Sequence, residues 1–144
     1  MCHNSARKGQ QFTKWTRSPH SQAFAVLATP RARELAAASG IDDAQRADAC
    51  LRCHVTGHGA PASHLTDRYR VEDGVGCESC HGPGGDYWKM TVMKDRDKSV
   101  AAGLVIPGEK VCTGCHNADS PTYKAFDFAV FKEKIAHPNP LNAK

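Results

Sequence analysis

The chain has 144 residues, with seven cysteines, eight histidines and a formal net charge of +4 at neutral pH. This length predicts one domain over residues 1–144, while an aromatic share of 7% and a mean hydropathy of −0.51 leave little material for an ordinary apolar core. Lysine and arginine form no run of five or more, which argues against a nucleic-acid-binding protein, and no stretch approaches the length of a transmembrane helix.

Capping signals predict a helix over residues 30–39. Thr29 can act as its N-cap, and Pro30 takes the first helical position, where its missing N–H has no partner to lose. The alanine-rich run continues to Ser39, and Gly40 follows as a suitable C-cap.

Short helices and irregular segments alternate in the middle of the chain. We expect Asp42 or Asp43 to cap a second helix that carries residues 50–54 at its C-terminal end. Residues 55–76 contain scattered glycines and a proline, so they are predicted to be irregular. Residues 95–102 are predicted to form a short helix that ends at a glycine.

The last third of the chain predicts two more helices. Pro107 opens one that delivers Cys112, and Asp127 caps a final amphipathic helix. In that helix we expect the apolar side chains to face inward and the lysines to face solvent: Phe128, Phe131 and Ile135 against Lys132 and Lys134. The predicted fold is therefore mostly α, with short helices, long loops and little or no sheet.

A CxxCH motif occurs three times, as CLRCH at 50–54, CESCH at 77–81 and CTGCH at 112–116. It is the attachment signature of a covalently bound c-type haem. Each cysteine forms a thioether with a haem vinyl group, and the adjacent histidine ligates the iron. The predicted anchors are Cys50, Cys53, Cys77, Cys80, Cys112 and Cys115, and the predicted proximal ligands are His54, His81 and His116.

Zinc sites and disulfides are the alternatives for these cysteines. A zinc site pairs CxxC with a second CxxC or with spaced histidines, and does not require histidine directly after the second cysteine. With this histidine content, the chance of a histidine at that place in all three motifs is about one in six thousand. A disulfide framework would not impose the repeated spacing. The motifs therefore favour haem, and large covalent rings would also supply the missing core.

The first residues, Met1-Cys2-His3, match the end of a further CxxCH motif whose first cysteine lies upstream. We expect the sequence to be a fragment that begins inside its first haem motif, with the export signal lost. Cys2 is also the odd cysteine after the other six are paired. On this interpretation Cys2 anchors a fourth haem and His3 is its proximal ligand. Haem attachment of this type takes place outside the bacterial cytoplasmic membrane, which predicts a periplasmic or extracellular protein.

The remaining histidines equal the expected haems in number, and they are His20, His58, His64 and His137. If all of them served as sixth ligands, every iron would be bound by two histidines. His20 and His137 are the stronger candidates, because His58 and His64 share one loop and could be surface residues. A thioether ligand from Met93 is a weaker alternative, because methionine more often fills gaps.

These features occur in the same order as in a known protein family. After the partial motif come Trp15, Ser18 and His20, then CLRCHVTG, GVGCESCHGPGG and VCTGCHN with Ser120-Pro121-Thr122, and finally Lys134-Ile135-Ala136-His137-Pro138. In this order the chain resembles the tetrahaem cytochromes of the cytochrome c-554 family over essentially its whole length.

The resemblance implies a compact, mainly helical, exported protein with closely stacked haems. It implies that His20 ligates the third haem and His137 the fourth, and that a histidine between the second and third motifs ligates the first. The second haem of the family can lack a strong sixth ligand. This chain departs from the pattern, because both His58 and His64 compete for the loop position.

These observations predict an electron-transfer protein of respiration that passes single electrons from a redox donor protein to an acceptor protein, and not an enzyme. Bis-histidine iron has no open position and suits electron transfer. The first alternative is a haem enzyme that acts on a small nitrogen species, such as nitric oxide or hydroxylamine, at a five-coordinate iron bound by His54. The second alternative is a subunit of a conductive filament or of a larger multihaem complex.

Overall fold

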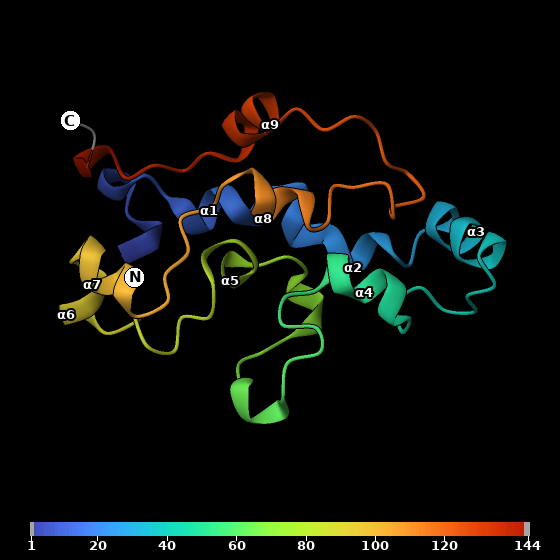
Figure 1. The fold of residues 1–144 in the computed structure, drawn as a ribbon, viewed down its shortest axis with the longest axis horizontal. Coiled ribbons are helices and arrows are strands. Elements are labelled where there is room, and N and C mark those ends of the chain that lie inside the picture. The colour runs from blue at the N-terminus through green and yellow to red at the C-terminus, as the bar shows by residue number, and fades with distance from the viewer. Residues whose placement is uncertain (1, 143–144) are drawn as a thin grey trace.

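The computed structural model describes residues 2–142, which form short helices joined by long loops, with no β-strand among them (Figure 1). The α-helices are α1 (Gln11–Thr16), α2 (Ala23–Val26), α3 (Pro30–Ala38), α4 (Asp48–His54), α5 (Cys77–His81), α6 (Met90–Met93), α7 (Arg96–Ala101), α8 (Glu109–Thr113) and α9 (Phe128–Ile135). The 3-10 turns are η1 (Cys2–Asn4), η2 (Ala6–Lys8), η3 (Pro19–Gln22), η4 (Ala62–His64), η5 (Val71–Asp73) and η6 (Pro140–Asn142). The predicted mostly α fold is confirmed.

Side-chain caps begin three of these helices, and the sequence predicts two of them, at Thr29 and Asp127. Thr29 accepts a hydrogen bond from the backbone N–H of the third residue of α3 at 3.2 Å. Asp95 and Asp127 do the same for α7 and α9, each at 3.1 Å. Such a bond satisfies one of the free N–H groups of the first turn, so short local sequences are enough to define these ends.

The predicted cap of α4 is wrong. Helix α4 begins at Asp48, after Ala47, and not near Asp42 or Asp43. The Asp43 carboxylate instead accepts a hydrogen bond from the N–H of Gln45 at 2.9 Å, which closes a tight turn. Aspartate side chains bond the backbone two residues ahead as readily as they cap helices, and here the turn is formed.

Helix α8 also differs in detail from its prediction. It begins at Glu109, two residues after Pro107, and ends at Thr113. Cys112 therefore lies in the helix, whereas Cys115 and the histidine after it lie on the following turn. Their backbone N–H groups both bond the carbonyl of Cys112, at 3.2 and 2.9 Å.

The inward face of α9 is only partly as predicted. Phe128 and Ile135 are half-buried, but the Phe131 side chain is 41% exposed and stacks on Phe126, with ring centres 5.1 Å apart. The lysines do not simply face solvent: the ammonium groups of Lys132 and Lys134 lie 5.6 and 4.5 Å from the ring centres of Phe128 and Phe131. Their aliphatic stems can cover apolar surface while the charged heads stay wet.

The apolar core is small. Buried Leu27, Ala36 and Ala44 form its centre, and Cys50 and Leu51 pack against them, so the core ties α3 and the segment after α2 to α4. The accessible surface of the chain is 10574 Å², whereas a compact monomer of this mass exposes about 7,300 Å². The polypeptide alone therefore does not close around its own apolar side chains.

The helices that carry the motifs lie centrally. In Figure 1, α4, α5 and α8 occupy the middle of the molecule, between α3 at one end and the α6–α7 pair at the other. The chain ends lie at the same side, where η2 packs on η6. This arrangement brings motifs that are far apart in sequence into one region.

Candidate functional site

Each complete motif lies on a helical turn that sets the direction of its cysteines. Helix α5 consists of the CESCH motif alone, and α4 ends with the histidine of CLRCH. Residues three apart lie on the same side of a helix, so the two thiols of a motif project together, as attachment to one edge of a porphyrin requires.

The six complete-motif cysteines are free thiols. Burial raises the pKa of the Cys115 thiol to about 11, and the nearby Cys53 and Cys80 thiols add to the rise. Burial likewise raises the pKa of Cys80, with Cys112 as a further cause. The second, third and fourth motifs thus present their cysteines to one shared region. The side chain of Cys2 and the whole of Met1 lie outside the described residues.

Three histidines have one ring nitrogen fixed by a backbone carbonyl. The Nδ1 atoms of His54, His81 and His137 lie 2.6, 3.3 and 2.7 Å from the carbonyl oxygens of Ala23, Val105 and Ile135. A carbonyl oxygen can only accept, so Nδ1 carries the proton and Nε2 keeps its lone pair. A hydrogen bond from the ring nitrogen that does not bind metal is the usual way in which a protein orients a metal-ligating histidine.

The structure brings four histidines together in two facing pairs. The rings of His20 and His116 have centres 6.1 Å apart and planes at 74°, and those of His81 and His137 have centres 6.0 Å apart and planes at 72°. Two imidazoles that bind one metal ion from opposite sides, at about 2 Å each, have ring centres about 6 Å apart. The spacing therefore fits an iron between the two rings of each pair.

Burial also prepares these pairs for ligation. Burial lowers the pKa of His20, and the neighbouring His116 lowers it further. Burial is likewise the main cause that lowers the pKa of His81, with smaller contributions from His137 and His3. The lowered pKa values keep the His20 and His81 rings neutral, and neutral imidazole is the form that binds metal. Because His3 contributes to the lowered pKa of His81, the partial first motif lies close to the third.

The pairing differs from the one that the family resemblance implies. The His20 ring lies beside His116 of the fourth motif, and the His137 ring lies beside His81 of the third, whereas the resemblance implies the third haem for His20 and the fourth for His137. The main-chain carbonyl of His20 accepts a hydrogen bond from the N–H of Val75 at 2.9 Å. The main chain of His20 is therefore tied beside the start of the third motif, while its ring lies against the fourth.

The loop histidines behave differently from one another. The Nε2 atom of His58 lies 3.3 Å from a carboxylate oxygen of Asp48, so the nitrogen that would bind iron is engaged elsewhere. His64 is exposed in η4, on the green loop that projects from the lower side of Figure 1. Among residues 2–142, no aromatic or imidazole ring is stacked on or edge-on to His54, His58 or His64.

The fit to haem also rests on exposed apolar side chains. Trp88 and Met90 are 64% and 57% exposed, and Met93 is 38% exposed. Tyr87 is held at the third motif, because its hydroxyl donates to the carbonyls of His81 and Gly82 at 3.0 and 2.7 Å. The donor set of paired histidines beside paired thiols, with uncovered apolar surface around it, suits a large flat cofactor better than a bare metal ion.

Thr56 is a site residue that sequence reasoning missed. Its hydroxyl oxygen accepts a hydrogen bond from the N–H of Gly76 at 2.6 Å and lies 2.8 Å from the hydroxyl of Ser79. Its own N–H donates to the carbonyl of Gly74 at 2.9 Å. Thr56 thus joins the end of the second motif to the start of the third. No local pattern identifies it, because its partners lie 18 to 23 positions away.

Comparisons with known proteins agree with the resemblance. The family described as cytochrome c554 and c-prime matches residues 1–82. A curated relative, cytochrome c-554 of Nitrosomonas europaea, is 29% identical over 130 residues, which cover 80% of this chain and 53% of the relative. The chain therefore spans about half the length of that relative. No solved structure is significantly similar to the chain.

Proposed function

Because the chain belongs to the cytochrome c554 and c-prime family, we propose that it carries single electrons between two redox proteins through four covalently bound c-type haems. The supporting observation is the presence of two facing histidine pairs, His20 with His116 and His81 with His137. Two histidine ligands leave an iron no open position, which favours electron transfer over substrate binding.

The residues that would hold the haems are those of the motifs. Their cysteines anchor the rings, with Cys2 and His3 serving the first haem and His54 the second. Haem supplies a one-electron iron couple, and the chain supplies anchors, axial nitrogens and cover from water. Attachment through thioethers supports a periplasmic or extracellular location. No helix in the described part of the chain is long and apolar enough to cross a membrane.

A haem count and spin states test this proposal first. We expect the mass of the exported holoprotein to exceed that of the chain by the mass of the attached haems, and low-temperature EPR to assign low-spin iron to at least two haems per chain. A holoprotein without covalent haem, or one whose irons are all high-spin, would contradict the proposal.

Individual histidines can be tested in the same way. His137→Ala should convert about one low-spin iron per chain to high-spin, because His81 loses its facing ring, and added imidazole should restore the signal. His64→Ala is the matched control, because His64 is exposed in η4, and it should leave the spectrum unchanged. A low-spin signal of undiminished intensity per chain in His137→Ala would refute the pairing.

A second candidate function has one observation in its favour. His54 faces no other histidine ring among residues 2–142, and a cavity of about 250 Å³ lies beside its motif, lined by Cys53, His58 and Cys115 among others. An iron with one histidine could bind a small nitrogen species there. The test is nitric oxide added to the reduced holoprotein: a ferrous–nitrosyl EPR signal of one iron per chain would support it, and no signal would exclude it.

A further inference from the structure

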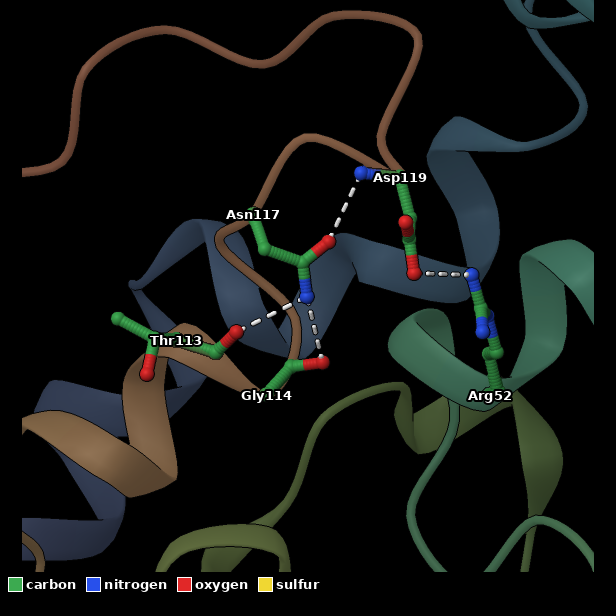
Figure 2. Close-up of polar contacts among 5 residues, drawn as sticks. All are labelled: Arg52, Thr113, Gly114, Asn117 and Asp119. Carbon is green, nitrogen blue, oxygen red and sulfur yellow. Dashed lines mark hydrogen bonds and ion pairs between the residues drawn. The ribbon is translucent and has the colours of Figure 1, made fainter.

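An ion pair connects the second motif to the segment after the fourth. Figure 2 shows Arg52, from the two-residue spacer of CLRCH, reaching Asp119, with Nη2 and Oδ2 3.1 Å apart. The two residues are 67 positions apart. In the described part of the chain, the other acid–base pairs join residues within ten positions of one another. Among the described residues, Arg52–Asp119 is therefore the ion pair that links the second motif to the segment after the fourth.

The Asp119 end of the pair is built on the fourth motif itself. The side-chain amide of Asn117 donates to the carbonyls of Thr113 and Gly114, at 2.9 and 3.1 Å, and its oxygen accepts from the N–H of Asp119 at 2.9 Å (Figure 2). Thr113 and Gly114 are the spacer of CTGCH. The network thus runs from one motif spacer to the other, and it fixes the turn that presents Asp119.

The surroundings place the cation between two haem anchors. Arg52 lines the same cavity as Cys53 of its own motif and Cys115 of the fourth. A fixed charge in such a position acts on both neighbouring redox centres.

Fold stability gives little reason for this pair. Its side chains are 53% and 67% exposed, and ion pairs this exposed contribute little to stability. Its charges nonetheless have opposite effects on a nearby iron. A cation stabilises the reduced state, which carries one more electron, and a carboxylate stabilises the oxidised state.

We propose that Arg52 and Asp119 set the difference in reduction potential between the haem held by residues 50–54 and the haem held by residues 112–116. This inference rests on the proposed electron-transfer function. With haems held by these motifs, the pair would bias the transfer of one electron from the iron held at His116 to the iron held at His54, so that the first would be oxidised, the second reduced, and no bond or proton exchanged. Arg52 raises the reduction potential of the haem held by residues 50–54, and Asp119 lowers that of the haem held by residues 112–116.

The test is a potentiometric titration of the holoprotein at fixed pH and low ionic strength, followed by visible and EPR spectra. R52Q should lower the potential of the haem nearest to it, and D119N should raise the potential of the haem nearest to it. Each should change the electron distribution between haems about three- to tenfold, where tenfold corresponds to about 59 mV for one electron. The double variant should combine both shifts and give the smallest difference between the two potentials, and salt should weaken all the shifts.

The control and the contrary outcomes separate charge from structure. R31Q removes the same charge from an exposed pair on α3, Arg31–Glu34, and should leave every potential unchanged. Shifts in the same direction for both single variants would mean that the pair acts only as a structural clamp, and unmoved potentials would overturn the inference. D119N lies outside every motif, so it remains informative even if R52Q impairs haem attachment. A wild-type chain without haem would instead refute the proposed function.

Discussion

Gly74 controls the position of the distal ligand candidate His20. Its φ of +66° and ψ of −134° define a conformation that glycine alone adopts freely. A Cβ atom there would lie 2.8 Å from the carbonyl oxygen of His20 and 3.1 Å from the nitrogen of Ala23. The next residue, Val75, bonds that same carbonyl through its N–H and accepts from the Trp15 indole at 2.8 Å. One small residue therefore lets two chain segments touch.

We expect Gly74→Ala to displace His20 and to convert about one low-spin iron per chain to high-spin in EPR spectra. Gly59→Ala is the matched control, because Gly59 has a φ of +76° with no heavy atom within 4 Å of its added Cβ. Both variants bear the cost of a positive φ, about 1 kcal/mol, but only Gly74→Ala adds a backbone clash. Equal spectra and equal urea midpoints for the two variants would refute this role.

Helices α4 and α5 are connected by hydrogen bonds and not by a shared apolar face. Thr56 follows α4, and its hydroxyl contacts both Gly76, the N-cap residue of α5, and Ser79 within α5. The Tyr69 hydroxyl donates to the Thr56 carbonyl at 3.0 Å, which also holds the intervening loop. The hydroxyl of Thr56 is thus the side-chain group that joins the end of the second motif to both the start and the middle of α5.

Thr56→Val should destabilise the holoprotein by about 1–3 kcal/mol, because valine has the same shape but leaves the Gly76 N–H without a partner. We also expect it to alter the magnetic interaction between haems in EPR spectra. The control is Thr16→Val, since the exposed Thr16 hydroxyl bonds only within its own helical turn, and it should change the urea midpoint little. Thr56→Val with wild-type stability and spectrum would contradict the role.

At the scale of the whole molecule, the chain buries too little apolar surface to be stable alone. Among the residues whose burial the structure describes, four apolar ones are buried, all of modest size, namely Leu27, Ala36, Ala44 and Val55. Ordering each backbone residue costs about 1–2 kcal/mol in conformational entropy, which so small a core cannot offset. Covalent rings packed against the exposed apolar side chains would supply the missing burial.

A haem-free chain should therefore lack a cooperative unfolding transition. Replacing the six complete-motif cysteines with alanine should abolish the thermal transition seen in calorimetry of the holoprotein, and should make the chain sensitive to limited proteolysis. Replacing only Cys112 and Cys115 should give an intermediate result, because it removes one haem. A cooperative transition in the six-alanine variant, at a temperature near that of the holoprotein, would show that the polypeptide is stable by itself.

The sequence alone determined the features that depend on neighbouring residues. The caps at Thr29 and Asp127, the short helix near residues 95–102 and the mostly α fold followed from local chemistry, because a cap and its helix lie within four residues. The motifs likewise identified the family, which residues 1–82 confirm. The haem ligands themselves remain predictions.

Only the tertiary structure decided which distant residues meet. His20 faces His116 rather than His81, the loop histidine His58 is paired with Asp48, and Thr56 joins two motifs. These contacts span loops whose path is set by glycine conformations and backbone hydrogen bonds, and no periodic pattern encodes such a path. The histidine count indicates how many irons could have two histidine ligands, but only the folded chain selects the partners.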